Sequence, residues 1–257
     1  MTAVLVTGAA GSIGSELTRQ LTEKYDKVYA IDSCEQRLFE FSSELLERGA
    51  NNVVPILCDL SAVYAIPAIL HKVSDIRSIF HAAAYKHVNM SQSNELSYMY
   101  NNVMSTVHAI DLAKHLQCPL IHVSTDKAVN PTNVMGMSKR ICEFLVFEAG
   151  NVIETFVVRF GNVLNSAGSV VPIFLNQISR GGPLTITDRA ATRFFMSIQD
   201  AVALVVDCQK VACDNKPVVL DMGPPILIDQ LAKNLCEERG LKIVNHKTRP
   251  DEIEITY

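Results

Sequence analysis

Side chains that could carry out chemistry are concentrated in residues 121–139, which read IHVSTDKAVNPTNVMGMSK. This stretch begins as a short apolar segment, typical of a buried strand, and then changes to Ser124, Thr125, Asp126 and Lys127. Side chains that follow the carboxyl end of a strand lie where an open α/β sheet binds its ligands. A hydroxyl, a carboxylate and an ammonium group at such a place could hold a polar substrate and move protons on it.

A helix is expected to begin near Val134, after a loop marked by Pro131 and Asn133. Met135 and Lys139 are four residues apart, so they share one face of that helix. A second ammonium group is therefore expected near the strand end. An isolated Ser-Thr-Asp-Lys sequence could also be a helix cap with solvated charges, but the glycine-rich loop near the N-terminus favours a binding site.

That loop follows the first strand-forming segment, residues 3–6, and precedes a helical pattern. Glycines there permit a tight turn and let backbone N–H groups approach a pyrophosphate at the helix N-terminus. Their spacing is one residue longer than the usual dinucleotide fingerprint, so the loop alone is weak evidence. We expect the phosphates of a dinucleotide to meet Gly8, Gly11, Ser12, Ile13 and Gly14.

Asp32 ends the second strand-forming segment, residues 27–31. A carboxylate there can accept the ribose hydroxyls and would repel a 2′-phosphate, which predicts NAD rather than NADP. Two later strand ends complete the expected cofactor site. Asp59 and Leu60 could reach the adenine, and Ala82, Ala83 and Ala84 are small enough for a flat cofactor to lie against the backbone.

Strand and helix patterns alternate over roughly the first 160 residues, which predicts an α/β fold with a doubly wound parallel sheet. The 257 residues are 48% hydrophobic and 19% charged, as in a folded protein with a substantial core. The net charge of −4 provides no basic surface for nucleic acid. We expect no membrane span, no signal peptide and a cytoplasmic protein. The seven cysteines lack a C-x-x-C pair, so we expect reduced thiols and no metal site.

Six segments together resemble the extended short-chain dehydrogenase/reductase superfamily, and within it the polysaccharide-biosynthesis branch of UDP-N-acetylglucosamine 4,6-dehydratases. They are TGAAGSIGSEL, HAAAYKHV, STDKAVNPTNVMGMSKR, RFGNVLNSAGSVVPIF, TRFFMSIQDAV and VLDMG. The resemblance implies a Rossmann domain over residues 1–163 that binds NAD and carries the catalytic residues. It implies a small sugar-nucleotide-binding region over residues 164–257, which partly returns to the core and is expected to be shorter than its counterparts.

The resemblance also implies roles at the site. The family's threonine-acid-lysine trio falls on Thr125, Asp126 and Lys127, and its ribose-binding helix lysine falls on Lys139. The family's catalytic tyrosine falls on Met135, which cannot take a proton, and a sub-branch of these dehydratases carries methionine there. The implied reaction removes hydride from C4 of the hexose, eliminates water across C5 and C6, and returns hydride to C6. Asp126 is expected to be the acid at C6 and Lys127 the base at C5.

UDP-N-acetylglucosamine or a similar UDP-hexose is the implied substrate, and a homodimer or larger homo-oligomer, formed through helices over residues 94–115 and 133–148, is the implied assembly. Arginine suits a diphosphate because its guanidinium fork pairs with phosphate oxygens. One of the mid-helix residues Asn101 and Asn102 is expected to hydrogen-bond to the catalytic strand. The expected sugar-nucleotide contacts are Lys86, His87, Asn102, Arg159, Asn162, Ser169, Arg193, Arg249 and Glu252.

Two other functions are compatible with the sequence. A nucleotide-sugar 4-epimerase or related sugar oxidoreductase would use the same cofactor and hydride step, although such enzymes usually keep the tyrosine. A degenerate NAD-binding module without catalytic activity is compatible with Met135. The acid and lysine beside each other favour the dehydratase, because only elimination of water needs both groups.

Overall fold

The computed structural model describes residues 2–164, 166, 168–186, 188–211, 216–219 and 221–239, and the backbone of residues 244–249 and 252–256. The chain forms two compact units. Unit 1 contains Met1–Phe160 and Gln199–Leu220, and unit 2 contains Gly161–Ile198 and Asp221–Tyr257.

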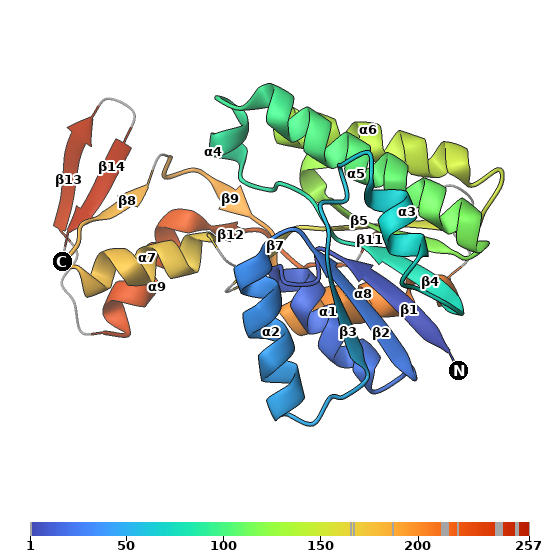
Figure 1. Ribbon diagram of the computed structural model, residues 1–257. Helices are drawn as coiled ribbons and strands as arrows, with labels where there is room; N and C mark the ends of the chain where they lie inside the picture. The colour runs from blue at the N-terminus through green and yellow to red at the C-terminus, as the bar shows by residue number, and fades with distance from the viewer. Residues whose placement is uncertain are drawn as a thin grey trace. The chain divides into compact units, whose positions relative to one another are not determined.

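A seven-stranded sheet forms the centre of unit 1, in the order β11-β6-β5-β4-β1-β2-β3 (Figure 1). All of its strand pairs are parallel. The chain reverses its direction of strand addition between β1 and β4, which confirms the predicted doubly wound α/β fold and places a ligand-binding crevice at the carboxyl ends of these strands. The strands are β1 (Ala3–Thr7), β2 (Lys27–Asp32), β3 (Val53–Leu57), β4 (Ile76–His81), β5 (Leu120–Thr125), β6 (Thr155–Phe160) and β11 (Val218–Val219).

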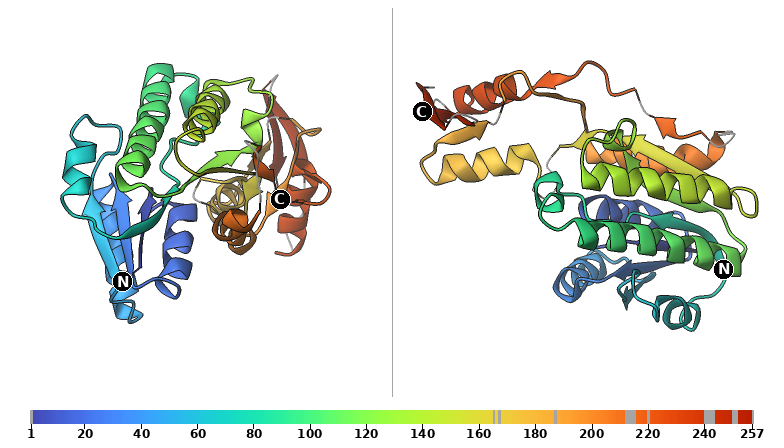
Figure 2. Two further views of the ribbon diagram at one scale, coloured as in Figure 1. Left: turned by 90° about the vertical axis from the view of Figure 1, so that its right-hand side faces the viewer. Right: turned by 90° about the horizontal axis from the view of Figure 1, so that it is seen from above.

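Helices cover both faces of this sheet (Figures 1 and 2). α5 and α6 lie side by side on one face. Because each face is covered, β1 is buried along its whole length and reads as a continuous apolar run. One layer contains α1 (Ser12–Thr22), α2 (Glu35–Glu47) and α8 (Ile198–Asp207). The other contains α3 (Ala65–Leu70), α4 (Val88–Ser91), α5 (Glu95–Leu116) and α6 (Val134–Ala149), and the 3-10 turns are η1 (Asp126–Ala128) and η2 (Cys208–Lys210).

The ends of α5 and α6 follow from local chemistry. α5 stops where Gln117 adopts a left-handed conformation, with φ at 49°. α6 begins after its N-cap residue, Asn133, whose side-chain oxygen accepts a hydrogen bond from the Gly136 N–H at 2.9 Å. Both helices match the ranges predicted from the sequence to within one residue.

Unit 2 is built from short elements around a small apolar core. Phe174, Leu184, Phe195 and Ile228 are buried in that core. Across the described part of both units, no helix has the length and apolarity needed to cross a membrane. The elements are β7 (Asn162–Val163), α7 (Val170–Ser179), β8 (Leu184–Ile186), β9 (Thr192–Arg193), β10 (Phe195–Met196), β12 (Ile226–Leu227), α9 (Ile228–Glu237), β13 (Val244–Arg249) and β14 (Glu252–Thr256).

A row of polar side chains crosses the otherwise apolar centre of the unit 1 sheet. Thr7, His81 and His122 are register partners on β1, β4 and β5, and all are fully buried. The Thr7 hydroxyl lies 2.7 Å from Nδ1 of His81, and the two imidazole rings are 5.2 Å apart. Burial, together with the charge of Lys139, lowers the pKa of His81 to about 3 and that of His122 well below its usual value. Both imidazoles are therefore neutral near pH 7.

The lowered pKa values of His81 and His122 predict how the free energy of unfolding depends on pH. A histidine with a lowered folded pKa contributes stability that is complete above its unfolded pKa, about 6.5, and is lost as the pH falls toward the folded value. In that window the unfolded chain binds one more proton per histidine, which costs about 1.4 kcal/mol per pH unit. In His122→Gln the unfolded chain binds one proton fewer. The slope of unfolding free energy against pH should therefore be smaller than in wild type by about 1.4 kcal/mol per pH unit.

Urea unfolding between about pH 6 and 4.5 measures both slopes. His71→Gln, the same substitution at an exposed position of the same unit, is the matched control. If His122→Gln keeps the wild-type slope, His122 is not held neutral in the folded protein.

Candidate active site

Thr125, Asp126 and Lys127 meet where β5 ends and η1 begins. Oδ1 of Asp126 accepts a hydrogen bond from the Thr125 hydroxyl at 2.9 Å and forms an ion pair with Nζ of Lys127, also at 2.9 Å. The side chains of Asp126 and Lys127 are 26% and 27% exposed. The Thr125 hydroxyl and the Lys127 amine thus both contact one carboxylate oxygen of Asp126, at the partly exposed carboxyl end of β5. Such a group of side chains could donate protons to a bound substrate and accept protons from it.

Residues 125–128, which we call the catalytic loop for its expected role, rest directly on the first turn of α6. A Cβ atom on Gly136 would lie 2.6 Å from the Lys127 carbonyl oxygen, so a side chain there would displace the loop or the helix. The close approach joins the Asp126–Lys127 pair to α6 through backbone atoms. Glycine at position 136 is therefore required by packing.

Met135, Lys139 and Glu143 follow one another at four-residue spacing on α6, and all three are buried. Nζ of Lys139 donates a hydrogen bond to the Val123 carbonyl at 2.6 Å and lies 3.1 Å from Nε2 of His122. Burial lowers the pKa of Lys139. In this structure the amine expected to bind the nicotinamide ribose thus lies against β5.

Glu143 forms the centre of a buried polar cluster. Its carboxylate accepts hydrogen bonds from Ser124 at 2.5 Å and from Nε and Nη2 of Arg159 at 2.7 and 2.6 Å. Arg140 adds a third donor at 3.0 Å. Burial alone would raise the pKa of Glu143, but the hydrogen bonds from Arg159 and Ser124 outweigh it and lower the pKa. Arg159, expected at the sugar nucleotide, is thus committed to an internal ion pair, with its side chain only 11% exposed.

The glycine-rich loop forms a cradle at the start of α1. Gly8 has φ at 67°, and a Cβ atom there would lie 2.7 Å from the Ala83 backbone nitrogen. Gly11 is the N-cap residue of α1 and has no side chain that would fill the space in front of the helix N-terminus, where a phosphate can bind. Oδ2 of Asp32 accepts from the Ala10 N–H and Oδ1 from the Cys34 N–H, both at 2.9 Å. The residues present therefore fit a dinucleotide.

The remaining expected cofactor contacts follow the carboxyl ends of β3, β4 and β1. Oδ1 of Asp59 accepts hydrogen bonds from the N–H and hydroxyl of Ser61, at 2.9 and 2.8 Å. Leu60 is buried, and the N–H groups of Ala82 and Ala83 donate to the backbone and the hydroxyl of Thr7. Ser12 and Ile13 form the first turn of α1 with Gly14, and Ala84 follows Ala83.

Asn102 does not make the bond expected from the sequence. Its Oδ1 accepts from the Tyr85 N–H at 2.7 Å, and its Nδ2 donates to the Tyr85 carbonyl and the Ser138 hydroxyl at 3.1 and 2.9 Å. The predicted bond from Asn101 or Asn102 to the catalytic strand is not the one observed: Asn102 lies where α5 packs against α6 and the loop after β4, and Nδ2 of Asn101 donates to Oδ1 of Asn102 at 3.0 Å. Lys86 and His87 continue that loop, and burial lowers the pKa of both.

In unit 2 the expected substrate residues occupy separate elements. The Asn162 N–H donates to the Phe194 carbonyl at 2.9 Å, and Arg193 is exposed on β9. The hydroxyl of Ser169, the N-cap residue of α7, is buried without a hydrogen-bond partner among the described residues. Arg249 and Glu252 are register partners on β13 and β14, and their side chains lie outside the described part of the structure.

Three buried side chains near the site were missed by reasoning from the sequence: His81, His122 and Glu143. The available signal was weak. His122 and Ser124 are polar residues at alternate positions of an apolar strand, so they face the same side of the sheet. Glu143 falls on the face of α6 that carries Met135 and Lys139, where an apolar residue would be the ordinary choice.

Comparison with known proteins identifies the family. Residues 4–256 match the family model described as "Polysaccharide biosynthesis protein". The chain is 40% identical over 247 residues to the capsular polysaccharide biosynthesis protein CapD of Staphylococcus aureus, which covers 93% of this chain and 41% of that protein. It therefore spans about two fifths of the length of this relative.

Two shorter relatives have enzyme names. A UDP-N-acetylglucosamine 4,6-dehydratase (inverting) of Campylobacter jejuni is 32% identical over 94% of this chain and 73% of its own length. A UDP-glucose 4-epimerase of Rickettsia massiliae is 35% identical over 90% of this chain and 69% of its own length.

A solved structure supports the fold. The dTDP-glucose 4,6-dehydratase DesIV of Streptomyces venezuelae, with NAD and DAU bound, superposes with a TM-score of 0.84 at 19% identity, over 94% of this chain and 82% of that one. The two proteins therefore share the arrangement of strands and helices described above. The chain therefore belongs to the polysaccharide biosynthesis protein family, in the extended short-chain dehydrogenase/reductase superfamily.

Proposed function

We propose that this chain is an NAD-dependent nucleotide-sugar 4,6-dehydratase that converts UDP-N-acetylglucosamine or a similar UDP-hexose into a 4-keto-6-deoxy sugar nucleotide. The observation that carries the proposal is the contact between Asp126 and Lys127, which places an acid and a base on one hydrogen bond of 2.9 Å. Elimination of water needs both groups, one to protonate the departing C6 hydroxyl and one to remove the C5 proton.

The glycine-rich loop would hold the pyrophosphate of NAD, and Asp32 would hold the adenosine ribose. Bound there, NAD would accept a hydride from C4 of the hexose and return it at C6. Lys139 would reach the nicotinamide ribose after leaving the Val123 carbonyl, a change of side-chain conformation within α6. Loop, acid and lysine all follow the carboxyl edge of one parallel sheet, where such cofactors bind.

The resting ion pair explains how Asp126 and Lys127 could act together. Transfer of one proton along their contact gives a carboxylic acid and a neutral amine, which are the forms that elimination requires. Exclusion of water by a bound substrate favours the neutral pair, because charges lose solvation. When Lys127 then takes the C5 proton and Asp126 protonates the leaving hydroxyl, the ion pair is restored.

Met135 supplies no proton, so the C4 hydroxyl must lose its proton elsewhere. Lys127 is the proposed base, and the Thr125 hydroxyl, which hydrogen-bonds to Asp126 at 2.9 Å, could relay that proton. The family's usual tyrosine would make this relay unnecessary. Lys127 would release the C4 proton to solvent, to which its side chain is partly exposed, before it takes the C5 proton. It would return a proton to C5 when the hydride reaches C6 and then regain one from solvent, which restores the ion pair.

Incubation with NAD and UDP-N-acetylglucosamine, followed by mass spectrometry, tests the proposal. Loss of one water from the sugar nucleotide supports it. A new sugar of unchanged mass would instead indicate a 4-epimerase, the alternative favoured by the similarity to the Rickettsia protein. An unchanged substrate would indicate a binding module without this activity.

Substitutions at the site should separate proton transfer from packing. Lys127→Ala and Asp126→Asn each remove a proton carrier and should lower turnover by about 10² to 10⁴-fold while the melting temperature changes little. Met135→Ala should keep most of the turnover but lose about 2–5 kcal/mol of stability, because a buried side chain is truncated.

Turnover measured beside thermal unfolding distinguishes the two effects. The role assignment fails if Lys127→Ala retains near-normal turnover while Met135→Ala loses it without unfolding.

Asp32 should determine the choice of cofactor. Asp32→Ala should weaken NADH binding and reduce the preference over NADPH, because a 2′-phosphate no longer meets a carboxylate. Asp32→Asn is the matched control: it keeps an acceptor for the Cys34 N–H but removes the charge, so it should change the preference with less loss of affinity. Fluorescence titrations with both cofactors measure the ratio, and a wild-type preference for NADPH would contradict the assignment.

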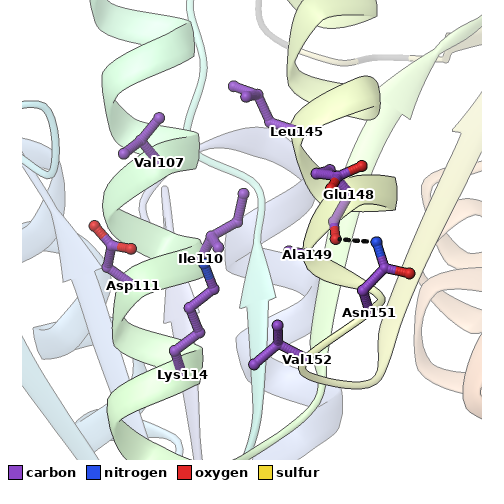
Figure 3. A pocket seen from close by; sticks show the side chains of 9 residues that line it. All are labelled: Val107, Ile110, Asp111, Lys114, Leu145, Glu148, Ala149, Asn151 and Val152. Carbon is purple, nitrogen blue, oxygen red and sulfur yellow. Dashed lines mark hydrogen bonds between the residues drawn. The ribbon is translucent and has the colours of Figure 1, made fainter.

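We also propose that the protein forms at least a homodimer through α5 and α6. Tyr100, Ile141 and Phe144 expose apolar surface on these helices. A hollow of about 320 Å³ lies between the same two helices, and Figure 3 shows Ile110 and Leu145 among the side chains that line it. A second copy could fill this hollow and cover the exposed side chains. Val146, also on α6, is buried in the core of its own unit and so does not contribute to this surface.

Phe144→Glu should weaken such a dimer, because it places a charge in an apolar contact. Light scattering at micromolar concentration should give a dimer for wild type and a smaller mass for the variant. Val152→Glu, at an exposed apolar position beyond the end of α6, tests whether the effect extends along the hollow. A monomeric wild type under these conditions would rule out the proposed assembly.

A further inference from the structure

We propose that Glu143 is a positioning residue that fixes α6 against the ends of β5 and β6 and so sets the geometry of the catalytic loop. The inference rests on the proposed function, because it assigns catalysis to Asp126 and Lys127. In this inference Glu143 contacts neither cofactor nor substrate and affects catalysis through the residues that it holds in place.

The carboxylate of Glu143 is completely buried and fully occupied. Oε1 accepts hydrogen bonds from Ser124 and from Nε of Arg159, and Oε2 accepts from Nη2 of Arg159 and from Arg140. The bonds to Arg159 form a bidentate pair, which restricts orientation as well as distance. Movement of α6 over the sheet would break several short hydrogen bonds at once.

Apart from Arg140, which lies on α6 itself, the donors to Glu143 come from two adjacent strand ends. Ser124 and Arg159 are register partners on β5 and β6. One carboxylate from the helix therefore ties both strands together at the same level. Ser124 is followed directly by Thr125 and Asp126, so this tie lies next to the proposed acid.

The same anchor determines where α6 places its other functional residues. Met135 and Lys139 lie two turns and one turn before Glu143 on the same buried face. Gly136 contacts the Lys127 backbone from the first turn of the helix. A shift of the helix would therefore move Lys139 and the catalytic loop together, and a misplacement of about 1 Å can cost on the order of 100-fold in rate.

Stability alone does not account for this cluster. A buried ion pair can often be replaced by apolar residues of similar volume without loss of stability, because desolvation offsets the attraction. Apolar contacts have no preferred direction and would allow α6 to slide, whereas the three hydrogen bonds from Ser124 and Arg159 to Glu143 permit one arrangement of helix and sheet. The network is thus suited to orientation, which the proton transfer at Asp126 requires.

Ser124→Ala provides the sharpest test, because it cuts the tie to β5 and leaves the Glu143–Arg159 pair intact. We expect kcat to fall on the order of 10 to 100-fold, with little change in KM or melting temperature. Hydrogen–deuterium exchange should become faster over residues 124–128 and the first turns of α6. Ser124→Thr keeps the hydroxyl and should restore both kcat and exchange protection.

Arg140→Gln is the matched control. It removes the partly exposed donor to Glu143 and leaves both strand ties in place, so kcat and exchange should stay near wild type. The inference is overturned if Ser124→Ala keeps wild-type kcat and exchange, if Arg140→Gln causes the same loss, or if the loss merely follows unfolding. Should Ser124→Ala fail to fold, Glu143→Gln is measured by the same criteria.

The exchange measurement also separates this inference from the proposed function. If wild type releases no water from any UDP-hexose, the proposed function fails, while exchange over residues 124–128 in Ser124→Ala still decides whether the tie orders this loop. If turnover is present but exchange is unchanged in Ser124→Ala, the positioning role fails and the proposed function stands.

Discussion

The packing of α6 onto the carboxyl end of β5 is the contact on which the proposed chemistry depends. Lys139 hydrogen-bonds to the Val123 carbonyl, Glu143 binds Ser124, and Gly136 lets the helix approach the Lys127 backbone. These contacts are polar and directional, in a unit whose remaining core is largely apolar. They fix the helix against the strand and so support the loop that carries Asp126 and Lys127.

This support matters more here than in relatives with a tyrosine. A tyrosine at position 135 would carry its own hydroxyl into the site, whereas in the proposed mechanism Met135 carries no proton and Thr125, Asp126 and Lys127 transfer the protons. A proton exchange within one ion pair requires both partners to be held in place by their surroundings, since neither is deeply buried. The amount of buried polar structure around this loop is consistent with that requirement.

Much of this could be predicted from the sequence because the signals are local. The glycine loop, Asp32 at a strand end and the run from Ser124 to Lys127 each follow from a few adjacent residues, and alternating patterns gave the parallel sheet. The polar row through Thr7, His81 and His122 could not be predicted in this way, because it depends on the register of three strands distant in sequence.

The roles of Asn102 and Arg159 illustrate the same limit. Both are polar residues near the expected site, and from the sequence a ligand is the natural partner for each. The structure pairs Asn102 with Tyr85 and Ser138, and Arg159 with Glu143, because helices α5 and α6 bring these groups together across the sheet. Such pairings depend on how the helices pack, which short-range patterns do not specify.

Transfer of the C4 hydrogen within one substrate molecule tests the central claim most directly. UDP-N-acetylglucosamine labelled with deuterium at C4 would be incubated with the protein and NAD, and the product examined by nuclear magnetic resonance and mass spectrometry. A dehydratase of the proposed kind gives a 4-keto-6-deoxy sugar that carries the deuterium at C6. Deuterium that stays at C4 of an epimerised sugar, or that is lost to solvent, would contradict the account.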